Sequence, residues 1–140
     1  MAGVEIVNQK ENNGHTKSDQ GSPLKFLFIS NESMSGDLAF TLKKEGHDVK
    51  VYIKAKSDAD VYDGFLEKVS EWQSLVDWCD IVVFDHVGFG EIADKLRKKG
   101  KKVIGGSAYT DRLEIEREFG QSEMRKYGIN VLPSWTFSNY

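Results

Sequence analysis

LKFLFI, residues 24–29, is the stretch that decides the fold of this chain. A short and almost unbroken apolar run is typical of a strand that is buried on both faces of a parallel sheet. Working outward from it, residues 49–53 alternate apolar and polar side chains, residues 81–84 read IVVF, and residues 102–104 read KVI. Each of these three runs predicts a further strand.

Helical patterns separate the predicted strands. Leu38 and Leu42 repeat at helical spacing before a stop at Gly46, and residues 91–99 form a second helical pattern that Gly100 closes. Apolar residues three or four apart between positions 69 and 79 predict another helix. A last helix is expected from a cap at Asp111 to about residue 127.

The alternation of strands and helices predicts an α/β fold. Parallel strands need long crossover connections, which helices usually fill. We therefore expect a Rossmann-like three-layer domain, with an open parallel sheet of four to five strands flanked by helices. Three regions are predicted: a disordered polar leader at 1–23, the Rossmann-like domain at 24–109, and a linker helix with the start of a further module at 110–140.

Composition excludes several classes of partner. The 19 Lys and Arg residues and 22 Asp and Glu residues are interspersed, which disfavours a nucleic-acid-binding face. A single cysteine, Cys79, cannot form an internal disulfide, and its place on an apolar stripe favours a buried side chain over a nucleophile. No apolar run is long enough for a signal peptide or a membrane span. We expect a cytoplasmic protein without a membrane partner.

Ligands of open parallel sheets bind at the carboxyl ends of the strands, where helix N-termini present unpaired N–H groups. Three predicted loops lie there, at residues 30–36, 85–90 and 105–110. The first is rich in hydroxyl groups and suits a phosphate or a carboxylate, or else Ser35 or Asp37 simply caps the helix. The candidate substrate-binding residues are Ser30, Asn31, Ser33, Ser35, Gly36, Asp37, Asp85, His86, Gly105, Gly106 and Ser107.

The motifs of two nucleotide-binding classes are absent from the first loop. It reads neither Gly-x-Gly-x-x-Gly nor Gly-x-x-x-x-Gly-Lys-Ser/Thr. Asp85 and His86 alone are too few ligands for a metal site, so no metal is expected. The pair Gly105-Gly106 indicates either tight backbone packing or the close passage of a ligand.

The second half of the chain resembles phosphoribosylamine-glycine ligase, a family of ATP-grasp enzymes. The resemblance covers residues 80–133, and residues 24–53 match more loosely. It implies an amino-terminal, substrate-binding domain of an ATP-dependent carboxylate-amine ligase of purine biosynthesis, inactive without its ATP-grasp module. ATP and Mg²⁺ would serve the full-length enzyme and would not bind this domain tightly. Arg117 aligns with the lysine that contacts the nucleotide phosphates in this family. The segments that carry the resemblance are CDIVVF (79–84), IADKLRKKG (92–100), VIGGS (103–107), DRLEIEREFG (111–120) and MRKYGI (124–129).

The chain departs from this family at its first loop. The family reads Gly-x-Gly-Gly-Arg-Glu-His there, whereas residues 30–37 contain neither Arg nor His. This leaves the amine and carboxylate substrates open. The alternative is a stand-alone Rossmann-like module that binds a phosphorylated small molecule or a partner protein. A receiver-like or flavodoxin-like domain is disfavoured, because Ser30-Asn31 stands where a receiver has an acidic pair.

Overall fold

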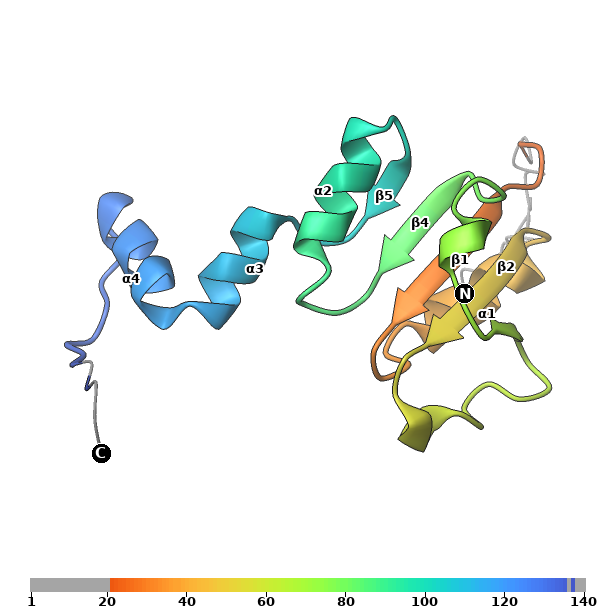
Figure 1. Cartoon of the computed structure of the whole chain (residues 1–140), viewed down its shortest axis with the longest axis horizontal. Coiled ribbons are helices and arrows are strands. Elements are labelled where there is room, and N and C mark those ends of the chain that lie inside the picture. The colour runs from red at the N-terminus through yellow and green to blue at the C-terminus, as the bar shows by residue number, and fades with distance from the viewer. Residues whose placement is uncertain (1–20, 136, 138–140) are drawn as a thin grey trace, which may run out of the picture.

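The computed structural model of the chain describes residues 21–135 and 137. The five strands form one sheet in the order β3-β2-β1-β4-β5, and every pairing is parallel (Figure 1). The predicted Rossmann-like α/β fold is therefore confirmed. In chain order the elements are β1 (Lys25–Ser30), α1 (Gly36–Lys44), β2 (Asp48–Ile53), the 3-10 turn η1 (Lys56–Asp58), β3 (Glu67–Val69), the 3-10 turn η2 (Gln73–Leu75), β4 (Ile81–Phe84), α2 (Gly90–Lys98), β5 (Lys102–Ile104), α3 (Ala108–Ile115) and α4 (Arg117–Lys126).

The run 24–29 forms most of the central strand, β1, whose side chains contribute to both hydrophobic cores. Phe26 and Phe28 point to the face that α1 covers, and Leu27 and Ile29 point to the face that α2 covers. All four side chains are at most 6% exposed. Burying a side chain of this size contributes about 1.5–3 kcal/mol. The two cores therefore fix β1 at the middle of a three-layer structure.

Both glycine stops that the sequence predicts are confirmed. Gly46 and Gly100 have φ values of 92° and 84°, in the left-handed region that favours glycine. The residues after them return a backbone N–H to the last helical turn, His47 to Leu42 and Lys101 to Leu96. Both helices α1 and α2 thus end by the glycine C-cap mechanism, and a strand begins directly after each.

Two predicted helices differ in the structure. Residues 69–79 do not form a helix, because Val69 ends the edge strand β3 and only the short turn η2 follows. Their apolar side chains still pack on the α2 face of the sheet, with Cys79 4% exposed. The single helix expected after Asp111 is two helices, since Glu116 leaves helical geometry with φ −95° and ψ 90°.

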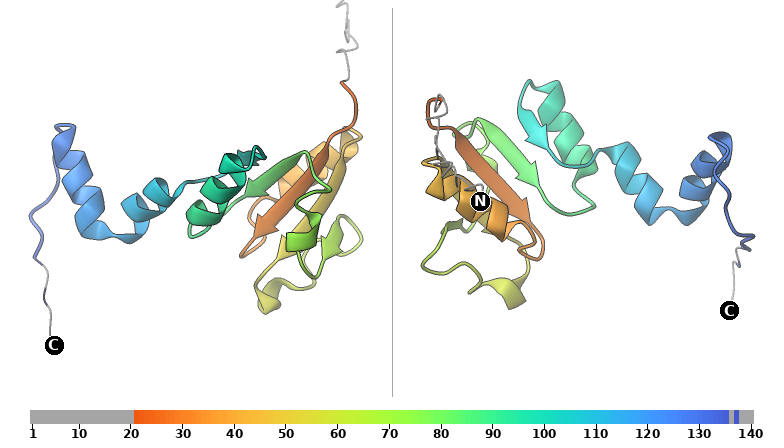
Figure 2. Two further views of the ribbon diagram at one scale, coloured as in Figure 1. Left: turned by 45° about the horizontal axis from the view of Figure 1, so that its top comes forward. Right: turned by 180° about the vertical axis from the view of Figure 1, so that it is seen from behind.

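Helices α3 and α4 form an arm that leaves the sheet. Figure 2 shows them leading away from β5, with α4 at the far end. The arm has a small core of its own, in which the Tyr109 and Phe119 rings lie 5.6 Å apart and the Arg112 guanidinium lies 3.8 Å from the Phe119 ring. Tyr109 also donates a hydrogen bond to Glu123 at 2.8 Å.

The predicted regions of the chain stay predictions. Residues 1–20 of the expected leader lie outside the described residues, and residues 21–23 are exposed and have no regular structure. The helix α3 begins at Ala108, close to the boundary expected between residues 109 and 110. Among the described residues, no helix has the length and apolarity that crossing a membrane requires.

Candidate functional site

The loops after β1 and β4 meet at the point where the strand order reverses. From β1 the chain proceeds to β2 on one side, and from β4 it proceeds to β5 on the other. The carboxyl ends of these two central strands therefore leave a crevice between their loops, which is where open α/β sheets bind ligands. Three of the predicted loops, those after β1, β4 and β5, lie at this edge of the sheet.

Asp85 joins the two central loops. One of its oxygens, Oδ2, accepts hydrogen bonds from the Ser35 backbone N–H at 3.0 Å and from the Ser35 hydroxyl at 2.6 Å. Ser35 immediately precedes α1, and its own side chain makes no capping bond. Asp37 is exposed in the first turn. Ser35 therefore occupies the N-cap position, as one of the two expectations has it, but its side chain donates to the Asp85 carboxylate of the neighbouring loop and does not cap the helix.

The aromatic ring of Tyr62 covers the start of α1. A Cβ atom on Gly36 would lie 2.2 Å from the Tyr62 ring, so only glycine fits there without a shift. The Tyr62 hydroxyl donates a hydrogen bond to the Ser33 carbonyl. Burial raises the pKa of this hydroxyl, which keeps it protonated as a donor. Ser33 and Tyr62 are the two non-glycine residues in the described chain with positive φ, at 59° and 67°.

His86 also links the loop after β4 to the loop after β1, through its Nδ1 atom. Its Nδ1 lies 3.0 Å from Asn31 Nδ2 and 2.7 Å from the carbonyl oxygen of Val87. The imidazole is partly exposed.

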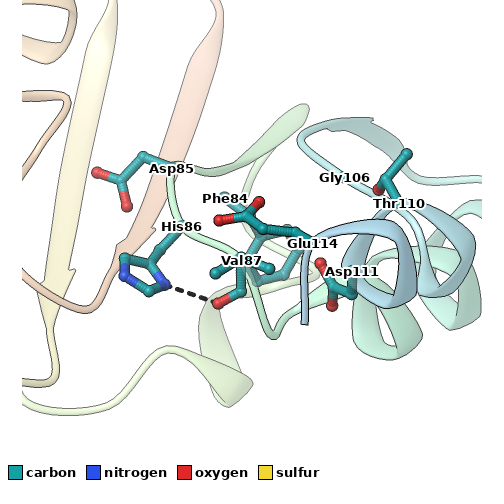
Figure 3. A pocket seen from close by; sticks show the side chains of 8 residues that line it. All are labelled: Phe84, Asp85, His86, Val87, Gly106, Thr110, Asp111 and Glu114. Atoms are coloured by element: carbon teal, nitrogen blue, oxygen red, sulfur yellow. Dashed lines mark hydrogen bonds between the residues drawn. The ribbon is translucent and has the colours of Figure 1, made fainter. Parts of the chain in front are cut away.

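A cleft of about 390 Å³ opens between the β4 loop and α3 (Figure 3). Three of its lining residues carry carboxylates, and Lys and Arg do not contribute to the lining. The volume lies within the range of roughly 300–1,000 Å³ that is usual for small-molecule sites. Its walls are Phe84, Asp85, His86, Val87, Gly106, Thr110, Asp111 and Glu114.

The helices α2 and α3 also receive carboxylates at their N-termini. Asp111 accepts a hydrogen bond from the Gly90 backbone N–H at 2.7 Å, and Asp94 accepts one from the Ala108 N–H at 2.9 Å. The Ala108 N–H and, to a lesser degree, Arg97 lower the pKa of Asp94. The residue that caps α3 is Ser107, in a capping box with Thr110, so the expected cap at Asp111 is wrong. Asp111 instead accepts its hydrogen bond at the N-terminus of α2.

The double glycine after β5 is held by backbone packing and by one arginine. Gly105 has φ 142°, and a Cβ there would lie 2.9 Å from the Phe84 carbonyl oxygen. Arg97 donates to the carbonyls of Gly105 and Gly106, each at 2.7 Å. Gly106 also lines the cleft. Of the two explanations that the sequence leaves open, tight packing accounts for Gly105.

Buried polar atoms without a partner are concentrated in the two central loops. Among the described residues, four buried side-chain oxygens accept or donate no hydrogen bond: those of Ser30 (Oγ), Asn31 (Oδ1), Ser33 (Oγ) and Asp85 (Oδ1). An unpaired buried polar group costs about 1–3 kcal/mol. All four lie in the β1 strand end and the loops after β1 and β4, and Asp85 belongs both to this set and to the lining of the cleft.

The structure brings most of the predicted site residues to one edge of the sheet. The Ser30–Asp37 segment contacts Asp85 and His86 through Ser35 and Asn31, and Gly106 faces Asp85 across the cleft. Arg117 stands apart, exposed on the first turn of α4. Sequence reasoning missed Thr110, Asp111 and Glu114 as cleft residues. Their position in the first turns of a helix that follows the third loop was the available signal.

A smaller pocket of about 300 Å³ adjoins the cleft on the far side of Asp111. It is lined by Gly88, Glu91, Ala108, Asp111, Arg112, Ile115 and Glu116.

Comparisons with known proteins find no protein-family model and no curated protein sequence that matches the chain. Solved structures with a similar fold include a V8 variant of the imine reductase from Myxococcus stipitatus in complex with NAD⁺, at 16% identity and a TM-score of 0.49. They also include shikimate dehydrogenase from Aquifex aeolicus, at 18% identity and a TM-score of 0.47. The matches cover 76% and 79% of this chain, but only 37% and 50% of those proteins.

These findings correct the resemblance drawn from the sequence. The two solved structures named above are a reductase and a dehydrogenase, and neither a family model nor a curated sequence of a phosphoribosylamine-glycine ligase matches the chain. The assignment to that family is wrong, and with it the expected ATP-grasp module, the role in purine biosynthesis and the cofactors ATP and Mg²⁺. The residue Arg117 was placed at a nucleotide by this resemblance alone. What stands is a Rossmann-like α/β domain.

Proposed function

We propose that this domain is a Rossmann-like binding module whose cleft takes a small ligand that carries amine or hydroxyl groups. The observation that carries the proposal is the state of Asp85. One carboxylate oxygen is bound by Ser35, and the other is buried without a partner among the described residues. A buried carboxylate oxygen accepts hydrogen bonds and donates none, so the group that would satisfy it is a donor.

The charge of the cleft supports the same class of ligand. Asp85, Asp111 and Glu114 contribute carboxylates to the lining, with the imidazole of His86 as the one nitrogen base. Glu114 is exposed and makes no hydrogen bond or ion pair with any other described residue. A cationic amine gains from such a lining, whereas a phosphate is repelled by it.

The start of α1 supports a ligand other than a dinucleotide. In dinucleotide-binding domains the pyrophosphate lies against the glycine-rich turn at this helix N-terminus. Here the Asp85 carboxylate bonds to Ser35, and the Tyr62 ring lies against Gly36. A pyrophosphate would have to displace both. The phosphorylated ligand expected from the sequence stays a prediction, and it is the natural competitor in a binding test.

The test is a titration of the ¹⁵N-labelled chain followed by amide chemical shifts. Four probes separate the alternatives: ethanolamine, glycerol, inorganic phosphate and NAD⁺. We expect ethanolamine or glycerol at millimolar concentration to shift the amides of Asp85, His86 and Gly106. Shifts caused by phosphate or NAD⁺ alone would overturn the proposal in favour of an anionic ligand.

Matched variants assign the binding to the cleft. Glu114→Gln removes one charge from the lining without disturbing a contact, and should weaken ethanolamine binding about threefold to tenfold, as expected for a partly exposed ionic hydrogen bond. Asp60→Asn is the control, since Asp60 is exposed in the turn after η1, outside the cleft. Equal affinities in the two variants would place the amine elsewhere.

A further inference from the structure

The outer edge of β5 has no strand beside it in the described part of the chain. The sheet order β3-β2-β1-β4-β5 is the 3-2-1-4-5 order of a doubly wound fold, in which a sixth strand pairs with the fifth. Lys102 and Ile104 are exposed on β5, and the exposed fraction of Ile104 is 54%. The Arg97 guanidinium reaches this strand only through a long contact of 3.5 Å to the Val103 carbonyl. An open edge of this kind is a template for pairing with a further strand.

The same chain carries a strand-like segment that lacks a neighbour. Residues 129–132, here called the exit segment, read INVL and stand directly before Pro133. They have no regular structure, and residues 130–132 make no backbone hydrogen bond with another described residue. Ile129 and Leu132 are 56% and 79% exposed. β-Branched residues favour strands, and a proline is tolerated beside a strand that forms the edge of a sheet. The exit segment therefore suits the vacant position next to β5.

Contacts at both joints of the arm hold the exit segment away from β5 of its own chain. Asp94 accepts a hydrogen bond from the Ala108 N–H at 2.9 Å, and Asp111 accepts one from the Gly90 N–H at 2.7 Å, which holds α3 against α2. At Gly120, α4 rests directly on the backbone of α3. Figures 1 and 2 show the exit segment beyond α4, at the opposite end of the arm from β5. It reaches its own β5 only if these contacts break, whereas pairing with β5 of a second copy leaves them intact.

Charge favours the exit segment over a second β5 as the neighbour of this edge. Lys101 and Lys102 begin the strand, and Lys98 and Lys99 end the helix before it. Pairing β5 with β5 of another copy would bring these lysines together, and like charges on neighbouring strands destabilise the pair. Lysines on edge strands commonly prevent such pairing. The exit segment carries no charged side chain, so it meets no repulsion there.

We propose that two copies of this chain exchange their arms, so that the exit segment of each pairs with β5 of the other as a sixth strand. Exchange about a twofold axis fills both open edges at once and closes the assembly as a dimer. The added strand gives hydrogen-bond partners to the backbone of residues 130–132. The inference is independent of the proposed ligand, since neither β5 nor the exit segment lines the cleft.

Analytical ultracentrifugation of the full chain over a dilution series tests for the dimer. The pairing itself is tested in a mixed sample of ¹³C-labelled and ¹⁵N,²H-labelled copies, in which isotope-filtered NOEs report contacts between chains only. We expect a dimer, with intermolecular NOEs between residues 130–132 and residues 102–104. A monomer at every concentration overturns the proposal, and so does a dimer without these NOEs. The same contacts found within single chains would show that the arm closes on its own sheet, which also overturns the exchange.

Two variants that differ only in charge test the neighbourhood of the exit segment. Leu132→Lys and Leu132→Glu both replace an exposed apolar side chain, so the folded chain should be kept. Beside Lys101 and Lys102 the new lysine is repelled and the new glutamate is attracted. We expect the dimer dissociation constant of Leu132→Lys to exceed that of Leu132→Glu by at least about fivefold at low salt, because each dimer holds two such contacts. High salt should reduce the difference.

The control pair is Met34→Lys and Met34→Glu, at an exposed position outside both strands. It changes the net charge of the chain by the same amounts, and we expect its two dissociation constants to agree. Equal constants for the two Leu132 variants at low salt would place the exit segment away from β5 and overturn the proposal. An equally large difference in the Met34 pair would attribute the effect to net charge and count against it as well.

Discussion

Asp85 directly follows the central strand β4, at the switch point of the parallel sheet. In dinucleotide-binding folds the N-terminus of the first helix faces a ligand phosphate. Here the same region faces an acidic side chain of the protein itself, through two hydrogen bonds to Ser35. The carboxylate takes the electrostatic place of the phosphate. This makes Asp85 a structural residue, and under the proposed function it also constrains the charge of the ligand.

Asp85→Ala should therefore reduce stability as well as binding. Loss of the acceptor at the start of α1 is expected to cost about 0.5–2 kcal/mol, by analogy with the removal of a helix N-cap. Urea unfolding of the full chain measures it. Asp60→Ala, an exposed position in a turn, is the control and should change stability by less than about 0.5 kcal/mol. Equal stability of the two variants would show that the Ser35 contacts contribute nothing.

Protonation of Asp94 should account for part of the decrease in the free energy of unfolding at acidic pH. Its pKa is lowered in the folded protein, chiefly by the Ala108 N–H, so the ionised form stabilises the fold. This contribution is complete above the ordinary pKa of an aspartate and is lost as the pH falls through the lowered value. We expect Asp94→Asn to flatten the fall of stability over that acidic range. Parallel curves for variant and parent would contradict the assignment.

At the scale of elements, α2 and the loop before α3 approach more closely than side chains allow. A Cβ atom on Gly90 would lie 2.2 Å from the carbonyl carbon and oxygen of Ser107. Both of these atoms belong to the backbone, so a rotamer change cannot relieve the clash. We expect Gly90→Ala to destabilise the domain by about 1–3 kcal/mol, as overpacking usually does. Thermal unfolding tests this against Gly21→Ala, where a Cβ would meet nothing within 4 Å.

The sequence predicts correctly those elements that combine a clear apolar pattern with a clear terminating residue. The central strand, the strand at 81–84 and the helices that end at Gly46 and Gly100 each combine a clear period with a clear stop. The segment 69–79 has helical spacing because its apolar residues cover one face of the sheet. That requirement fixes which side chains point inward, but it does not fix the backbone that carries them.

The site was predictable in its place but not in its contacts. Parallel topology brings the ends of β1 and β4 together, so Asn31, Ser35, Asp85 and His86 could be named from the sequence. Spacing gives no information on which carboxylate turns toward which helix. The bond from Gly90 to Asp111 joins residues 21 positions apart on different helices, and only the packing of α2 against α3 creates it.

At the scale of the whole molecule, the arm depends on one close helix contact. A Cβ atom on Gly120 would lie 2.5 Å from the Leu113 carbonyl oxygen, so α4 rests directly on the backbone of α3. The sheet cores contain no residue of α4 among the buried clusters of the described chain. Regions with few buried contacts open locally at lower free energy than the core.

Gly120→Ala should therefore destabilise the arm without destabilising the sheet. We expect amide hydrogen exchange in α4 to accelerate by at least an order of magnitude, because the contact with Leu113 is lost, while amides of β1 and β4 exchange as in the parent. Ser122→Ala, at an exposed position of the same helix, serves as the control. Equal acceleration in β1 would show that arm and sheet unfold as one unit.

The central position of β1 also has a consequence during synthesis on the ribosome. Of the described strands, β1 is synthesised before its two neighbours, β2 on one side and β4 on the other, and β4 is made much later than β2. Lys25 and Asp80, which join the starts of the two strands, are 55 positions apart. At a translation rate of about 5–20 residues per second, the central strand β1 remains without that partner for roughly 3–11 s. Nascent chains stalled within this interval would expose the LKFLFI segment to chaperones and to one another.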